Sequence, residues 1–161
     1  MRNSKSTEGS INLELTVPVT ADQAFETFVK EINSWWPKEY TWAGEVLDKI
    51  EIETFKNGRC FERGPHGFEC DWGRVIVYDP PNRIVFTWQI APDRVPEPNP
   101  EKVSEIEVLF VEKGKTETQV KFEHRNFEKH GDNAESYKQA LNSSQGWHYI
   151  LNNYNESFSK Q

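Results

Sequence analysis

The sequence predicts an α+β domain in which a curved antiparallel sheet of about seven strands wraps around a long C-terminal helix. Three observations support this prediction. Residues 11–17 alternate apolar and polar side chains, residues 44–125 form strand-like runs separated by turn signals, and an apolar stripe at helical spacing follows Gly131. A strand, a helix, a run of strands and a terminal helix are typical of domains whose helices gather on one face of a sheet.

Length and charge limit the classes of protein to which the chain can belong. Its 161 residues suffice for one domain, expected over residues 11–161 after a flexible polar leader, residues 1–10. The 26 acidic and 19 basic side chains give a net charge of −7, which disfavours nucleic acid and anionic membranes as partners. Neither an apolar stretch of about 20 residues nor a signal peptide is evident, which predicts a cytoplasmic protein.

The first two elements are a strand and a helix. Apolar residues at alternate positions of 11–17 predict a strand with one buried face, and Pro18 ends it. Thr20 is a suitable cap for a helix over residues 21–32. Trp35-Trp36-Pro37 then breaks the helix, and we expect this segment to fold over a pocket as a lid or plug.

Six further strands follow, separated by turns such as Asn57-Gly58 and the segment 79–82. Their expected ranges are roughly 45–55, 59–63, 68–78, 83–91, 103–112 and 116–125. The proline-rich segment 92–100 cannot pair inside a sheet and is expected to be a loop near the pocket mouth.

The last element is predicted to be a long helix. Gly146 lies within it and allows a close approach or a bend. The apolar stripe that predicts the helix consists of Tyr137, Ala140, Leu141, Trp147, Ile150, Leu151, Tyr154 and Phe158.

Short strings along the chain carry a family resemblance. They are 58–63 (GRCFER), 69–75 (ECDWGRV) and 79–83 (DPPNR), and the similarity continues through 86–90, 122–125, 127–131 and 146–147. Together they make residues 11–158 resemble the SRPBCC or START-like (birch-pollen-allergen-like) superfamily, and most closely its activator-of-heat-shock-protein-ATPase-like branch. Cys60 departs from the pattern, because a large aromatic residue is common at that position in the branch.

The resemblance implies a helix-grip fold, with a cavity between the sheet and the terminal helix. Residues 11–161 would then form a single START-like ligand-binding domain. The superfamily includes lipid carriers, hormone receptors, aromatase/cyclases and co-chaperones, so the resemblance constrains the fold far more than the function. A chaperone ATPase partner and a role in stress response are implied by the branch alone.

The sequence does not favour a metal, a cofactor or catalysis. Cys60, His66, Cys70 and His124 are residue types that bind zinc, but they lack the close spacing of zinc motifs. Neither a nucleophile elbow nor a glycine-rich phosphate loop is present, so no catalytic residue is predicted. The two cysteines are expected to be reduced, although a bridge stays open because they lie on neighbouring predicted strands.

The six tryptophans are the strongest indication of a binding site. Each ring alone is more commonly a core residue, but so many rigid rings in a small polar chain favour an apolar pocket. We expect Trp72, Trp88 and Trp147 to lie in or beside it. Alternation along residues 120–124 turns His124 inward, either as a core residue or as a polar contact for a ligand.

Glu62 shares a strand face with Cys60 and would need a partner if buried. Arg59, Arg63 and Arg74 are the candidates for an ion pair. The complete predicted ligand-binding set is Trp35, Trp36, Cys60, Glu62, Trp72, Trp88, Phe110, Phe122, His124, Trp147 and Leu151.

These observations favour noncatalytic binding or transport of a small apolar or aromatic molecule. The alternative is a co-chaperone-like interaction domain. A third hypothesis is a cyclase or hydrolase that uses His124 with Glu62 or Asp71. It requires those side chains to meet in the pocket, which the sequence does not show. A homodimer stays open.

Overall fold

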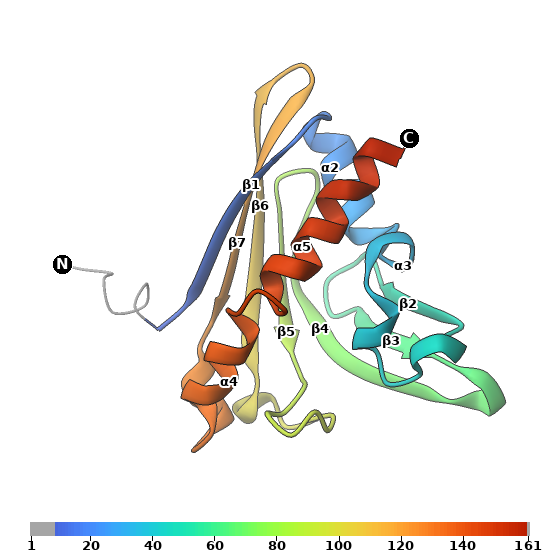
Figure 1. Cartoon of the computed structure of the whole chain (residues 1–161), viewed down its shortest axis with the longest axis vertical. Helices are drawn as coiled ribbons and strands as arrows, with labels where there is room; N and C mark the ends of the chain where they lie inside the picture. Colours follow the sequence, from blue (N-terminus) through green and yellow to red (C-terminus); the bar gives the residue numbers. More distant parts are fainter. Residues whose placement is uncertain (1–8, 161) are drawn as a thin grey trace.

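A computed structural model describes residues 9–160, and the elements follow the predicted α+β order (Figure 1). The seven-stranded antiparallel sheet has the strand order β1-β7-β6-β5-β4-β3-β2. The strands are β1 (Ile11–Val17), β2 (Lys49–Ile52), β3 (Arg59–Arg63), β4 (Glu69–Asp79), β5 (Arg83–Trp88), β6 (Ser104–Gly114) and β7 (Glu117–Arg125). The α-helices are α2 (Ala21–Val29), α3 (Ile32–Trp35), α4 (Ala134–Leu141) and α5 (Trp147–Glu156).

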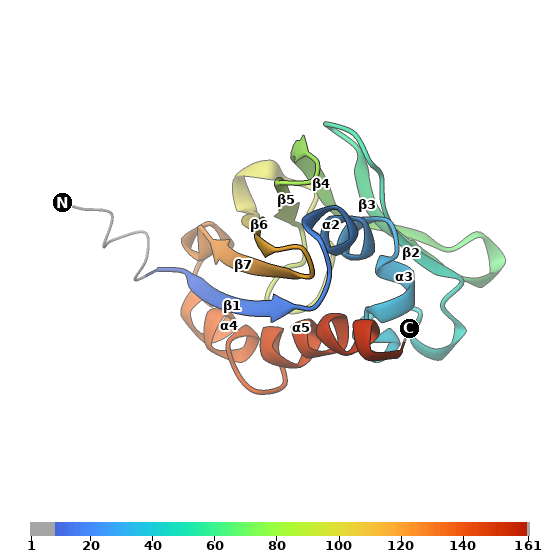
Figure 2. The same ribbon diagram turned by 90° about the horizontal axis from the view of Figure 1, so that it is seen from above.

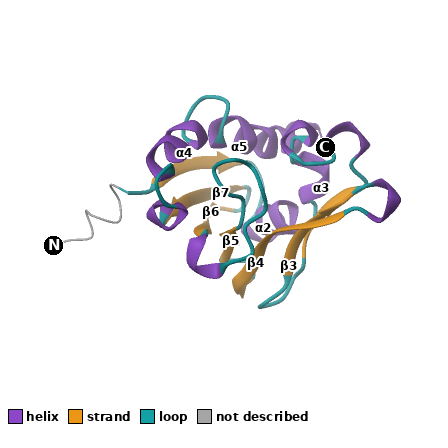
Figure 3. Ribbon diagram, turned by 90° about the horizontal axis from the view of Figure 1, so that it is seen from below, coloured by secondary structure: helices purple, strands orange, loops and turns teal. Residues whose placement is uncertain are grey.

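The sheet curls into an open arc. Seen from above, α2 lies inside the curl and α5 runs across its open side (Figure 2). The view from below shows α4 and α5 along the same side of the sheet (Figure 3). This arrangement confirms the predicted helix-grip class, in which side chains from the concave face of the sheet meet those of the helices.

The two strands at one edge of the sheet formed as predicted. β1 pairs with β7 along its whole length, from Ile11 opposite His124 to Val17 opposite Thr118. Inward residues of β7 are buried at every second position, which is the reason that alternation predicted this strand. Only Gly9 and Ser10 of the expected leader are described, and residues 1–8 lie outside the described part of the chain.

The first helix is shorter than predicted. α2 ends at Val29 rather than continuing to residue 32, and a separate turn, α3, follows. The backbone leaves helical geometry at Glu31 (φ −110°, ψ 25°), and the Trp35 indole donates a hydrogen bond to the Thr27 carbonyl across 2.9 Å. The bend lets α3 bury Ile32 and Trp35 on the same core as α2.

The strand expected over residues 45–55 is reduced to β2. Gly44 has a left-handed backbone (φ 58°), and residues 44–46 form a 3-10 turn instead of pairing. Beyond Ile52 the chain leaves the sheet, and the Phe55 side chain is exposed. The segment before β2 is therefore free to cross the sheet end.

The predicted long C-terminal helix is two helices, α4 and α5, separated by residues 142–146. At Gly146 the backbone comes so close to the Leu141 carbonyl that a Cβ would overlap it. The apolar stripe continues across the break because Tyr137, Leu141, Trp147 and Ile150 are all buried. Tyr154 joins α5 to α2 by donating from its hydroxyl to the Ala24 carbonyl across 2.7 Å.

Within residues 9–160, every helix is too short or too polar to span a lipid bilayer.

Candidate functional site

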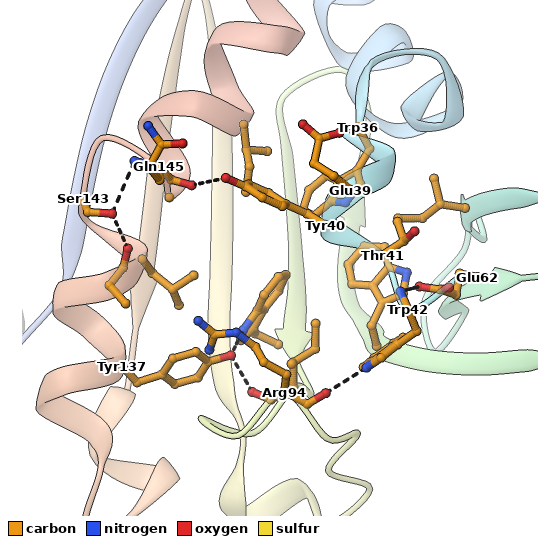
Figure 4. A pocket seen from close by; sticks show the side chains of 18 residues that line it. Trp36, Glu39, Tyr40, Thr41, Trp42, Glu62, Arg94, Tyr137, Ser143 and Gln145 are labelled. Carbon is orange, nitrogen blue, oxygen red and sulfur yellow. Dashed lines mark hydrogen bonds between the residues drawn. The ribbon is translucent and has the colours of Figure 1, made fainter. Parts of the chain in front are cut away.

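A cavity of about 490 Å³ opens at the end of the sheet where β2, β4 and β5 face the junction of α4 and α5 (Figure 4). The segment 36–42 and the loop after β5 complete its walls. Its aromatic lining residues are Trp36, Tyr40, Trp42, Trp72, Trp88 and Tyr137.

Trp36 forms the centre of the inner wall. Its ring stacks on Trp72, with centroids 5.9 Å apart and planes 20° apart, and it also meets the rings of Trp88 and Trp147. Pro37 disfavours helical geometry at Trp36, which is extended (φ −67°, ψ 132°), so the side chain turns toward the sheet. Trp35 turns the other way and packs against Phe28 and Tyr154.

Of the two expectations for the Trp35-Trp36 pair, a lid or a plug, the buried rings agree with a plug, and Trp36 lines the cavity rather than covering its entrance. The following segment crosses the mouth instead (Figure 4). Tyr40 donates from its hydroxyl to the Gln145 carbonyl across 2.7 Å, and the Trp42 indole donates to the Arg94 carbonyl across 2.8 Å. These two hydrogen bonds connect segment 38–42 to the helical junction on one side and to the β5–β6 loop on the other.

Glu62 is a buried carboxylate, 1% exposed, at the cavity wall. Its two oxygens accept hydrogen bonds from the backbone N–H groups of Trp42 (3.0 Å) and Ala43 (2.8 Å). Charge-assisted bonds of this kind compensate for the loss of water around the carboxylate. Glu62 therefore fixes the end of the segment that crosses the mouth.

The expected ion pair between Glu62 and an arginine does not form. Alternation along β3 places Arg59 and Arg63 on the opposite face of the strand from Glu62. Arg59 pairs there with Glu69 and Asp71, and Arg63 pairs with Glu69.

Tyr137 carries the polar atom on the helical side of the cavity. Its hydroxyl accepts from the Trp88 indole and donates to the Ile90 carbonyl, each across 2.7 Å. Burial raises the pKa of Tyr137 to about 12. The Arg94 guanidinium lies 5.1 Å from the centre of the Tyr137 ring, a distance at which the cation is attracted to the ring face.

His124 points inward as predicted but lies behind the cavity wall in a hydrogen-bonded chain. The Trp147 indole donates to His124 Nδ1 across 3.0 Å, so Nε2 carries the ring proton and donates to Ser104 Oγ at 2.7 Å. Ser104 Oγ in turn lies 2.7 Å from His130 Nε2. Burial holds the pKa of His124 well below its ordinary value.

The structure divides the predicted site residues into two groups. Trp36, Glu62, Trp72 and Trp88 line the cavity. The others are buried outside its lining, and Trp147 is in ring contact with both Trp36 and Trp88 from behind the wall. Those residues are Trp35, Cys60, Phe110, Phe122, His124, Trp147 and Leu151.

Sequence reasoning did not select Tyr40, Trp42, Arg94 or Tyr137 for the site. Trp42 is one of the six tryptophans that indicate a pocket, and Tyr137 belongs to the apolar stripe of the predicted C-terminal helix, so both could have been selected from the sequence. Arg94 lies in the proline-rich loop that was expected near the mouth. No sequence pattern indicates Tyr40, because the residue that it contacts, Gln145, lies 105 positions away in the sequence.

Two of the four residues considered as metal ligands, Cys60 and Cys70, are free thiols. Cys60 is fully buried, Cys70 is half-buried, and burial raises the pKa of both thiols. In the part of the chain that the structure describes, no three His, Cys, Asp or Glu side chains gather in a way that could hold a metal ion.

Two of the solved structures that are similar to this chain share 25–30% of its residues. The chain is 30% identical to an anthrahydroquino-γ-pyrone synthase, Txn09, complexed with SUM, covering 91% of this chain and 95% of that one with a TM-score of 0.65. It is 25% identical to the self-sacrificing resistance protein CalC from Micromonospora echinospora, covering 94% of each chain with a TM-score of 0.65.

A third structure shares the fold alone. Protein NE0264 from Nitrosomonas europaea is 12% identical over 96% of each chain, with a TM-score of 0.64. A comparison with curated proteins gave no match. Residues 18–157 match the family model described as activator of Hsp90 ATPase homolog 1-like protein. This match spans nearly all the described elements, and the chain therefore belongs to the activator of Hsp90 ATPase homolog 1-like family.

Proposed function

We propose that this protein binds a flat apolar or aromatic molecule in the cavity between the sheet and the two C-terminal helices, without changing it chemically. The observation that carries the proposal is the cavity itself, about 490 Å³ with six aromatic rings in its walls. Small-molecule sites in proteins have volumes of roughly 300–1,000 Å³ and mostly apolar linings with a few placed polar groups. The rings are held by contacts to each other, which favours a rigid, planar occupant.

The descriptions of the 30% and 25% identical structures are consistent with this proposal. One is described as the synthase of an anthrahydroquino-γ-pyrone and the other as a resistance protein. The name of the first refers to a fused aromatic compound, and a cavity walled by indole rings is suited to a compound of that shape.

The ionisable groups at the cavity favour binding over catalysis. Both oxygens of Glu62 are occupied by backbone N–H groups, and Glu39 accepts from the Tyr149 hydroxyl across 2.5 Å. Tyr137, with a pKa of about 12, is poorly matched to proton transfer near neutral pH. The cyclase hypothesis needs His124 and Glu62 in one pocket, but only Glu62 lines the cavity and His124 lies outside its lining.

The identity to a synthase supports a second candidate, a ring-forming reaction in the same cavity. Ring closure of a polyketide substrate would give a product that has lost water if the closure is a condensation, or an isomer of equal mass if it is an addition, whereas binding alone would return the ligand unchanged. The co-chaperone-like alternative rests on the family description.

A thermal-shift screen of fatty acids, polyketides and flavonoid-like compounds tests the proposal. A ligand at a hundred times its dissociation constant should raise the melting temperature by about 5–10 °C. Ala140→Trp places a ring in the cavity wall and should reduce this shift. Gln139→Trp adds the same ring one position away, outside the lining, and should preserve it.

Chromatography coupled to mass spectrometry of the recovered ligand separates binding from conversion, because an isomeric product differs in retention time and a dehydrated product differs in mass. The proposal fails if no compound in the screen stabilises the protein, or if Gln139→Trp abolishes the shift as completely as Ala140→Trp.

A further inference from the structure

We infer that the cavity selects ligands that present a carbonyl-type acceptor oxygen to the indole N–H groups of Trp36 and Trp72. The inference rests on the proposed function and adds the chemical class of the ligand: a planar aromatic ketone, quinone or pyrone rather than a hydrocarbon. Its basis is a mismatch between hydrogen-bond donors and acceptors in the cavity wall.

Trp36 and Trp72 are the unusual pair among the tryptophans. Both line the cavity, they are 8% and 3% exposed, and their rings stack on each other. Neither indole nitrogen has a hydrogen-bond acceptor among the described residues. A buried donor without an acceptor is destabilising, so such groups in native proteins call for an explanation.

The other four indole N–H groups are all paired. Trp35 donates to the Thr27 carbonyl and Trp42 to the Arg94 carbonyl. Trp88 donates to the Tyr137 hydroxyl, and Trp147 donates to His124 Nδ1. This fold therefore provides acceptors for indoles in its core and at the cavity mouth. The two donors that remain unpaired belong to adjacent rings of the inner cavity wall.

Three side chains with acceptor oxygens in the cavity wall already accept hydrogen bonds within the protein. Both oxygens of Glu62 accept backbone N–H groups, Glu39 accepts from Tyr149, and the Tyr137 hydroxyl accepts from Trp88. The two indole N–H groups are therefore the donors of the inner wall that lack an acceptor among the described residues. A ligand hydroxyl can also accept a hydrogen bond, but it adds a donor that itself needs an acceptor, whereas a carbonyl oxygen brings two lone pairs and no hydrogen.

Both indole nitrogens are covered by neighbouring atoms, so the rings must tilt as an oxygen approaches. That tilt would alter the stacking of Trp36 on Trp72. Tryptophan emission is therefore a direct readout of the contact, in addition to reporting that a ligand has entered.

The test compares 9,10-anthraquinone with anthracene, which have the same fused-ring outline and differ in the two carbonyl groups. Affinity is measured by tryptophan emission and by thermal shift. Transfer from water alone favours the hydrocarbon, because anthracene is the more apolar compound. We expect the opposite order, with anthraquinone bound about tenfold more tightly.

Substitutions then locate the preference. Trp36→Phe and Trp72→Phe each keep a ring but remove the donor, and should lower the anthraquinone-to-anthracene affinity ratio toward one. Trp42→Phe is the matched control, because this cavity tryptophan already donates to the Arg94 carbonyl. It should weaken both compounds while leaving their ratio unchanged.

The outcomes distinguish failure of the acceptor preference from failure of ligand binding itself. If wild-type protein binds both compounds with equal affinity, or prefers anthracene, the acceptor inference is wrong and the binding function stands. If neither compound binds, and the wider screen also fails, the proposed function falls with it. Should the phenylalanine variants not fold, the wild-type ratio, repeated with fluorenone and fluorene, still decides the question.

Discussion

The Trp147 indole N–H donates to His124 Nδ1 across 3.0 Å, which joins the first residue of α5 to the end of β7. Because Nδ1 accepts, the His124 ring is neutral with its proton on Nε2. Ser104 continues the chain to His130, so two histidines and one hydroxyl connect α5, β7, β6 and the turn after β7. A second proton on His124 would have to replace the bond from Trp147.

This relationship predicts a loss of stability in mild acid. Burial lowers the pKa of His124 and of His130 in the folded protein, with Glu97 opposing the effect at His130. In the unfolded chain the same histidines titrate near pH 6.5, so below that pH the unfolded state binds more protons than the folded state. The contribution of these histidines to the unfolding free energy is therefore fully present well above pH 6.5 and is lost as the pH falls below it. His124 should contribute more to this loss than His130, because His124 is fully buried and His130 is only partly buried.

Urea unfolding at pH 7.5, 6.5 and 5.0 measures the effect. In His124→Gln the decrease over this interval should be smaller than in the wild type, even though the variant is less stable at pH 7.5. A wild-type unfolding free energy that is constant from pH 7.5 to 5.0 would contradict the neutral, buried state of His124.

Replacing Glu62 should loosen the segment that crosses the cavity mouth. Glu62→Gln keeps the size of the side chain but turns an NH₂ group toward one of two backbone donors. We expect a loss of about 1–3 kcal/mol in unfolding free energy, with faster amide exchange at residues 42 and 43.

Glu51→Gln is the control for the Glu62 substitution. Glu51 pairs with Lys49 on partly exposed positions, where an ion pair contributes about 0–1 kcal/mol. Equal losses in the two variants would show that the backbone contacts of Glu62 contribute no more than a surface pair.

Gly146 is predicted to tolerate no side chain. A Cβ there would overlap the Leu141 carbonyl, so Gly146→Ala should destabilise the protein by about 2–4 kcal/mol through displacement of α5 from α4. Gly114→Ala is the matched control, since a Cβ at Gly114 has no neighbour within 4 Å. Thermal unfolding measures the stability of both variants. An unchanged melting temperature in Gly146→Ala would contradict the close approach of Gly146 to the Leu141 carbonyl.

The sequence predicted those parts of the fold that depend on local patterns. β1 and β7 follow from alternation, and the start of α2 follows from Thr20, whose hydroxyl accepts from the Gln23 N–H. The break between α4 and α5 was missed because buried residues keep helical spacing on both sides of it. Only the approach of the chain to the Leu141 carbonyl distinguishes a break from a bend.

The site was predicted less completely for a physical reason. An excess of rings indicated a cavity, and Trp36, Trp72 and Trp88 line one, but the count could not separate them from Trp35. The partners of Glu62 are backbone N–H groups, which nearly every residue carries, so no pattern in the sequence marks them.

The contacts across the cavity mouth have a consequence for evolutionary variation. Tyr40 and Trp42 both donate to main-chain carbonyls, those of residues 145 and 94, rather than to side chains. Any amino acid at position 145 supplies the same oxygen, and so does any amino acid at position 94 that accepts the left-handed backbone found there (φ 71°). Side chains around the opening could therefore diversify between related proteins, altering which molecules are admitted, without the compensating second substitution that a side-chain pair would demand.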